Sequence, residues 1–135
     1  MASDRPATPD DVDAICRSLP EVELGTSWGD VPTYLVRGRG FVLFRHPHPT
    51  AVDPTTGEEY DDLLVIVTPS AVEKQALVDD ERLPFFTIEH FHNYPAVLIQ
   101  LTAADPQQIR AAVVDGWLAC APKAVAQQYV TENPT

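Results

Sequence analysis

Apolar residues recur at helical spacing close to the start of the chain. Thr8 and Pro9 supply an N-cap and a first helical position, and the acids Asp10 and Asp11 follow at the positive end of the helix dipole. The next apolar residues have the three- and four-residue spacing of a buried helix face: Val12, Ile15, Cys16 and Leu19. Because proline cannot continue a helix, this helix is predicted to end before Pro20.

Two later segments begin with the same signals. Thr68 and Pro69 repeat the cap and the proline, so a helix is expected from there to about Asp79. Asp105, Pro106 and a capping-box Gln108 open another helix, whose expected buried stripe is Ile109, Val113, Val114, Trp117 and Cys120. Ala121 and Pro122 interrupt it, and residues 124–135 are expected to add a short helix and then fray.

Between these helices, short apolar runs predict five strands, at residues 33–37, 41–46, 63–67, 85–88 and 96–101. The first two flank Gly38-Arg39-Gly40, whose glycines suit a hairpin turn. Residues 21–32, punctuated by glycine and proline, are interpreted as a connection. Residues 47–61, with three prolines, a glycine and four acids, are expected to form an exposed loop and the most mobile internal segment.

The predicted order is α-β-β-β-α-β-β-α. Short hairpins make a sheet largely antiparallel, and amphipathic helices bury one side on it, so an α+β two-layer sandwich with the helices on one face is expected. A chain of 135 residues is typical of one domain, here residues 1–135 with an ordered core of about 8–122 and frayed termini.

The net charge of the chain limits the classes of function that are expected for it. The net charge is −11, and a strongly acidic chain repels phosphate, which disfavours general nucleic-acid binding. The N-terminus has no apolar signal-peptide core, and no apolar run approaches the ~20 residues that span a bilayer, so a cytoplasmic protein without a membrane partner is expected.

One stretch departs from this acidity. Residues 31–52 contain no acid and carry Arg37, Arg39 and Arg45, a local +3 against −14 elsewhere. Arginines on a hairpin resemble a DNA-binding wing, although neutralising three phosphates gives a salt slope of only about −2.7. DNA binding through Arg37–Arg45 is therefore one alternative, and pairing of these arginines with surface acids is the other.

The richest segment for binding chemistry runs from Glu89 to Leu101. It places His90, Asn93 and Tyr94 in a polar and aromatic turn before a strand that is expected to be buried. Trp28 also lies in a connection, where an aromatic ring with a polar edge can face a pocket. A shallow ligand site is expected from Trp28, His90, Asn93 and Tyr94, bordered by Arg37 and Lys123.

The histidines and cysteines suggest two other chemistries, metal binding and thiol catalysis. The four histidines form two His-x-His pairs, His46/His48 and His90/His92, which could hold Zn²⁺ or Ni²⁺ only if the pairs met in space. Prolines 47 and 49 bend the first pair away from any strand, so solvated histidines and one turn-capping histidine are the alternative. Cys16 and Cys120 lie on predicted buried stripes, where cysteine acts as a small apolar residue.

Several blocks, in the same order along residues 10–125, resemble the MmcQ/YjbR family. The blocks are 19–29 with 32–41, then 62–69, then 85–98, and last Trp117 with 121–123. The resemblance implies a CyaY-like fold and little about activity, although the family often carries a DNA-binding label that follows from fold similarity. This chain departs from the family at His92-Asn93, where an acid and a glycine are usual. Asn93 is expected to take the glycine's place in a left-handed turn.

The sequence therefore favours a non-enzymatic binding or interaction domain for a small ligand, a peptide or a protein. It contains no recognisable catalytic constellation, and no cofactor is expected. DNA binding through the arginine hairpin is the first alternative and a histidine metal site is the second. The sequence leaves the oligomeric state open.

Overall fold

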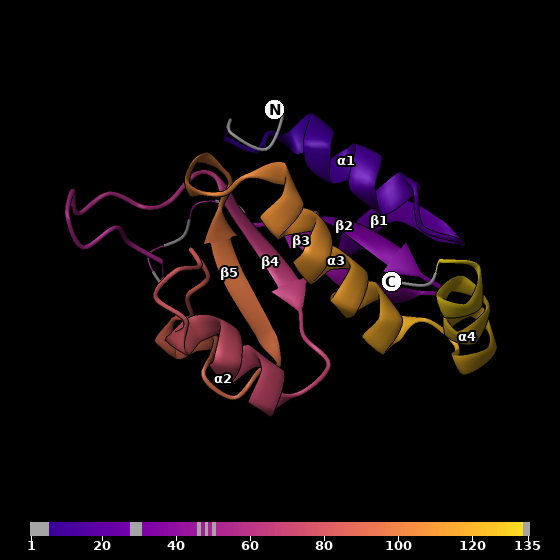
Figure 1. The fold of residues 1–135 in the computed structure, drawn as a ribbon. Coiled ribbons are helices and arrows are strands. Elements are labelled where there is room, and N and C mark those ends of the chain that lie inside the picture. The colour runs from indigo at the N-terminus through magenta and orange to yellow at the C-terminus, as the bar shows by residue number, and fades with distance from the viewer. Residues whose placement is uncertain (1–5, 28–30, 46, 48, 50, 134–135) are drawn as a thin grey trace.

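The computed structural model describes residues 6–133 except 28–30, 46, 48 and 50, and it leaves the side chain of His90 undescribed. Five strands form one sheet in chain order, and every neighbouring pair is antiparallel (Figure 1). The strands are β1 (Val22–Ser27), β2 (Val31–Val36), β3 (Arg39–Phe44), β4 (Leu63–Val67) and β5 (Ala96–Gln100). The helices are α1 (Pro9–Arg17), α2 (Ala71–Asp79), α3 (Pro106–Cys120) and α4 (Lys123–Glu132).

The expected α+β layout, with an antiparallel sheet and helices packed on one face, is confirmed. The local signals at two helix starts are confirmed as well. Thr8 and Asp11 cap each other's backbone at α1, and Asp105 and Gln108 do the same at α3. The short helix expected after Pro122 is α4, in which Tyr129 packs on Trp117 with the ring centroids 5.1 Å apart.

Three boundaries differ from the sequence prediction. Residues 22–27, expected as part of a connection, form the edge strand β1, which pairs with β2 along its full length. Residues 85–88, expected as a strand, make only a single bridge between Phe86 and Leu98. The cap of α2 is Ser70 and not Thr68, because the Thr68 amide still bonds the Pro95 carbonyl beside the sheet.

Alternate residues of the central strands feed two separate cores. On the helix-covered face, Leu64, Ile66, Val97 and Ile99 pack with the buried stripes of α1 and α3. The opposite face is covered by connections rather than helices. There the side chains of β2–β5 pack against loop residues: Val31, Leu43, Leu63, Val65, Ala96 and Leu98 contact Ala51, Tyr60, Phe86, Ile88 and Phe91.

The close approach of α3 to the sheet depends on Gly116. A β-carbon at this position would lie 2.6 Å from the carbonyl oxygen of Val67, which is closer than real β-carbons approach. Trp117, fully buried beside it, donates its indole N–H to the Pro20 carbonyl at 3.1 Å. Gly116 and Trp117 therefore fix how α3 lies across β3 and β4 (Figure 1).

The connection at residues 47–61 is exposed along much of its length, as expected, and it is also anchored. Val52 bridges to Glu59, and Ala51 is 1% exposed. Tyr60 packs on Phe86, with the ring centroids 5.6 Å apart. This segment extends from one end of the sheet (magenta in Figure 1), and its base covers part of the second core.

A lysine is the one described residue of α2 that is buried. Lys74 is 7% exposed, and its ammonium donates to the carbonyl oxygens of Phe91 at 2.6 Å and Tyr94 at 2.7 Å. The carbonyl of His92, at 3.5 Å, completes a set of three acceptors for three N–H donors. Burial lowers the pKa of Lys74 from its ordinary value of 10.5. Lys74 therefore ties α2 to the turn at residues 91–94.

Replacing Lys74 tests how much its hydrogen bonds to the turn stabilise the fold. Lys74→Met keeps the aliphatic stem and removes the hydrogen bonds of the ammonium, while the Phe91 and Tyr94 carbonyls keep their backbone N–H donors, so we expect a loss of about 1.5–3 kcal/mol in the free energy of unfolding. Urea denaturation measures it. Lys123→Met, at an exposed position on α4, is the control and should change stability by less than about 0.5 kcal/mol. Equal, small effects of both substitutions would contradict the assignment.

Candidate functional site

Of the predicted ligand residues, the structure describes Asn93, Tyr94 and Lys123, and it places Lys123 apart from the other two. Trp28 lies outside the described residues, as does the side chain of His90. Asn93 and Tyr94 are exposed in the turn that Lys74 holds near α2. Lys123 begins α4, which Figure 1 places at the far end of the molecule from α2.

The expectation of a left-handed Asn93 is wrong. The non-glycine residues with positive φ in the described chain are Glu21 and Arg37. Residues 89–91 form a 3-10 turn, and His92 continues it with φ −50° and ψ −45°. A right-handed turn is sufficient here, because the nearby carbonyl groups point at the Lys74 ammonium.

The three arginines of the hairpin are engaged with different parts of the protein. Arg37 forms an exposed ion pair with Glu21, and Arg39 donates to the Cys120 carbonyl at 3.2 Å. Arg45 is half-buried, with its guanidinium 5.5 Å from the centre of the Phe91 ring. Pairing with an acid, the expected alternative to a DNA wing, is confirmed at Arg37.

Neither a metal site nor a reactive thiol emerges from the described residues. His46, His48 and the side chain of His90 fall outside them, and His92 is exposed. Among the described side chains, no group of three or more His, Cys, Asp and Glu could hold a metal ion. Both cysteines are buried, as predicted, and burial raises the pKa of Cys16 to about 12, well above the range in which a thiolate forms at neutral pH.

A cleft that the sequence prediction missed lies between α2 and α3. Its volume is about 490 Å³, within the range of small-molecule sites. The floor comes from β4 and β5 through Ile66, Val67 and Val97, and Leu83 and Phe85 line it after α2. The α2 wall is Glu73, Ala76 and Leu77, and the α3 wall is Gln107, Gln108, Ala111, Ala112 and Asp115.

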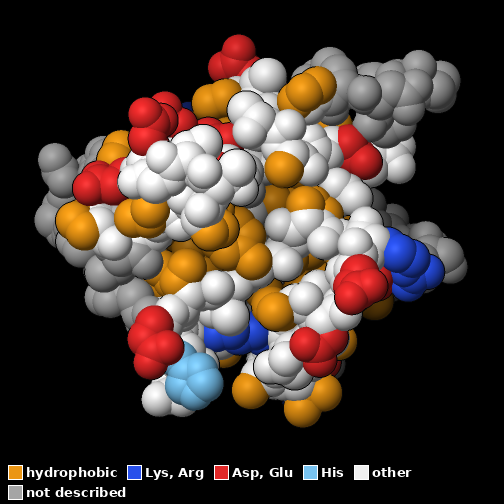
Figure 2. Space-filling model, turned by 90° about the vertical axis from the view of Figure 1, so that its left-hand side faces the viewer, with side chains coloured by type: hydrophobic (Ala, Val, Ile, Leu, Met, Phe, Trp, Pro, Cys, Tyr) orange, Lys and Arg blue, Asp and Glu red, His pale blue; other side chains and the backbone are white. Residues whose placement is uncertain are grey.

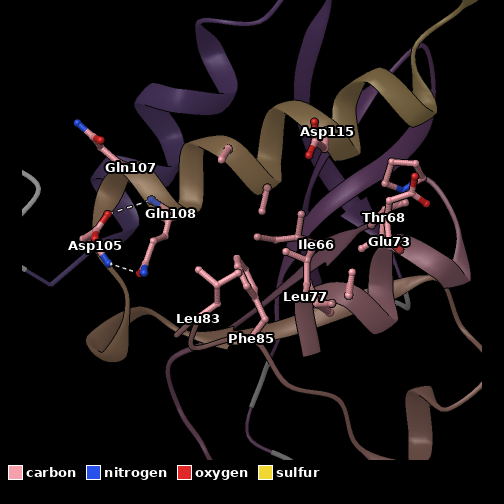
Figure 3. A pocket seen from close by; sticks show the side chains of 16 residues that line it. Ile66, Thr68, Glu73, Leu77, Leu83, Phe85, Asp105, Gln107, Gln108 and Asp115 are labelled. Atoms are coloured by element: carbon pink, nitrogen blue, oxygen red, sulfur yellow. Dashed lines mark hydrogen bonds between the residues drawn. The ribbon is translucent and has the colours of Figure 1, made fainter. Parts of the chain in front are cut away.

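Polar groups lie toward the two ends of this cleft, with apolar side chains between them (Figure 3). At one end, Asp105 and Gln108 bond each other in the capping box of α3, so these groups are already satisfied. The other end holds Thr68, Glu73 and Asp115. The Thr68 hydroxyl donates to the Ser70 carbonyl at 3.1 Å, and the Ser70 hydroxyl donates to the Glu73 carboxylate.

Asp115 differs from these neighbours. In the part of the chain that the structure describes, no hydrogen-bond donor or cation pairs with its carboxylate. Although Asp115 is exposed, desolvation beside the cleft raises its pKa above the ordinary 3.8, and the nearby charge of Glu73 adds to the effect. On the side of the molecule that Figure 2 shows, apolar side chains gather in the middle, with acidic side chains around them and basic ones among these.

The sequence contained a weak signal for the cleft. Gln108, Ala111, Ala112 and Asp115 follow one another at helical spacing on α3. This face is small and polar where a helix that contacted its neighbour closely would carry large apolar residues. The signal could be interpreted only once α2 was known to lie opposite.

Asp115→Asn should reveal the cost of this unpaired charge. A carboxyl whose pKa is raised in the folded state favours folding while it is protonated, and that contribution is lost as the pH rises through the raised value. We therefore expect the variant to melt at the same or a slightly higher temperature than wild type at pH 7. The difference should close as the pH falls below about 3.8, the unfolded value.

Thermal unfolding followed by circular dichroism between pH 3.5 and 7 measures this difference. Glu23→Gln, at an exposed position on β1, removes one charge outside the cleft and should show no such trend. A variant at Asp115 that is clearly less stable than wild type at pH 7 would mean that the carboxylate has a stabilising partner, and would contradict the assignment.

Comparisons with known proteins establish the family and leave the activity open. Three relatives, one from Mycobacterium bovis and two from Mycobacterium tuberculosis strains, are named as uncharacterized proteins. Each is 35% identical to this chain over 60 residues, which cover 44% of this chain and 46% of the relative. The chain thus spans about half the length of these relatives, and no solved structure matches it significantly.

In the described residues, no helix is both long and apolar enough to cross a membrane. The family model YjbR matches residues 17–119, most of the chain, and the protein therefore belongs to the YjbR family.

Proposed function

We propose that this YjbR-family protein is a non-enzymatic binding domain that holds a small, largely apolar ligand in the cleft between α2 and α3. The observation that carries the proposal is the cleft itself, about 490 Å³ in volume, with apolar side chains along its floor and polar groups at its ends. Mostly apolar pockets with a few polar groups are the usual form of small-molecule sites.

The turn at residues 91–94 has a supporting role in this proposal. Its carbonyl groups hold Lys74, and Lys74 lies on α2, the helix that also provides Glu73, Ala76 and Leu77 to the cleft wall. The turn therefore positions one wall of the cleft without lining it. This role gives a reason why the segment from Glu89 to Leu101 carries the resemblance to the family while its exposed side chains lie outside the cleft.

DNA binding through Arg37, Arg39 and Arg45 is the alternative function. The arginine contacts do not favour it, because two of the three side chains are directed at protein groups, the Cys120 carbonyl and the Phe91 ring. The net charge of −11 also opposes approach to a duplex.

Filling the cleft should abolish binding of an apolar probe. N-phenyl-1-naphthylamine, which is uncharged at neutral pH and fluoresces in apolar surroundings, should bind the wild-type protein. Ala76 is exposed on α2 and lines the cleft, so the ring in Ala76→Phe can occupy the cleft without disturbing the core. We expect this variant to bind the probe at least about tenfold more weakly, a change of about 1.4 kcal/mol.

Ala124→Phe is the matched control, because Ala124 is exposed on α4 and does not line the cleft. It should bind the probe with the wild-type Kd. The fluorescence titration is made at equal protein concentration for all three proteins. Absence of binding to the wild type, or equal loss in both variants, would overturn the proposed function.

A further inference from the structure

The described charged groups that line the cleft are all acids. Asp105 lies at one end, where it caps α3, and Glu73 and Asp115 line the other end from opposite walls, whereas no described Lys or Arg lines the cleft. Figure 3 shows these two acids toward the same end, beside Thr68, and the apolar side chains of Ile66, Leu77 and Phe85 farther in. The cleft therefore has an apolar body with acids at both ends, and at one end the acid, Asp105, is engaged in the α3 cap.

Of the acids that line the cleft, Asp115 is the one without a described hydrogen-bond partner. Glu73 accepts a hydrogen bond from Ser70 at the cap of α2, whereas Asp115 is paired with no described donor or cation. Asp115 is exposed at the edge of the cleft, next to apolar surface and a second acid, and an opposite charge would stabilise its carboxylate there. A cation that reaches this end would therefore gain a charge-assisted hydrogen bond.

We propose that the ligand of this cleft is an organic cation, a protonated amine on an apolar body, whose ammonium pairs with Asp115 near Glu73 while the body lies over Ile66, Leu77 and Phe85. This inference rests on the proposed function, since it names the class of ligand for the same cleft. The charge of the cleft is complementary to the ammonium, and its apolar floor is complementary to the body.

An inorganic cation fits these residues less well. Divalent cations need several oxygen ligands, and the described residues hold no cluster of three or more acids, histidines or cysteines. The Thr68 hydroxyl is already bonded to the Ser70 carbonyl. A strongly hydrated ion would also gain nothing from the apolar floor. An amine needs one carboxylate and uses the whole cleft.

Three compounds with the same apolar body test the inference: 4-phenylbutylamine, 4-phenyl-1-butanol and 4-phenylbutanoate. Their Kd values are measured by displacement of N-phenyl-1-naphthylamine at pH 7. We expect the amine to bind about tenfold more tightly than the alcohol, because one charge-assisted hydrogen bond is at stake, and the carboxylate to bind most weakly.

Asp115→Asn should weaken the amine to about the level of the alcohol and leave the alcohol unchanged. Glu23→Gln, which removes an exposed charge on β1, should retain the preference of the wild type for the amine. A loss of preference in Glu23→Gln as well would show that the net charge of the protein, and not Asp115, selects the cation, and would overturn the inference.

The outcomes distinguish failure of the organic-cation inference from failure of the proposed function. If the uncharged probe binds in the cleft while the amine and the alcohol compete equally, or the amine does not compete, the organic-cation inference is overturned and the proposed function stands. If Asp115→Asn weakens both compounds alike, Asp115 shapes the cleft without selecting charge, which also overturns the inference. If the uncharged probe itself fails to bind the wild type, the proposed function falls first.

Discussion

Lys74 places an ammonium group against backbone carbonyls of the turn at residues 91–94, in a part of the fold shielded from water. Leu77 and Val78 of α2 are half-buried against the helix-side core, and its other residues besides Lys74 are exposed. A buried ammonium without acceptors would be costly, so the burial of Lys74 depends on the carbonyls of this turn. On the opposite side of the turn, Phe91 enters the second core beneath the Arg45 guanidinium. One charged side chain thus links α2, the family-like turn and the loop-covered face of the sheet.

The contact between Lys74 and the turn also affects the helix-covered face of the sheet, because it positions α2 there. The position of α3 is set separately. Gly116 lets this helix approach the Val67 carbonyl, and the indole N–H of Trp117 donates to the Pro20 carbonyl. With α2 held at one side by Lys74 and α3 held over the sheet by its own contacts, the floor between them stays open as a cleft. The small side chains of Ala111 and Ala112 do not fill it. The cleft is therefore a product of two independent anchors, and Glu73 of α2 and Asp115 of α3 come near each other at one of its ends.

Local chemistry made the helices predictable. The capping pairs Thr8–Asp11 and Asp105–Gln108 involve residues three apart, so the sequence alone reveals them. Features that depend on distant partners were not visible. The exposure pattern of β1 lacks clear alternation, and the strand exists because β2 pairs with it. Residues 85–88 were apolar enough for a strand and yet found a single partner in Leu98. The burial of Lys74 depends on carbonyls 17 to 20 residues later, and the role of Asp115 depends on α2 lying opposite.

The central claim is that the cleft between α2 and α3 binds a small molecule. A methyl NMR titration of the isoleucine-, leucine- and valine-labelled protein with 4-phenylbutylamine tests it most directly. The account predicts that the largest shifts occur at the methyl groups lining the cleft, those of Ile66, Val67, Leu77, Leu83 and Val97. Exposed residues elsewhere, such as Leu24 on β1 and Val130 on α4, should be unaffected. Shifts centred on those distant methyl groups, with none in the cleft, would contradict the account.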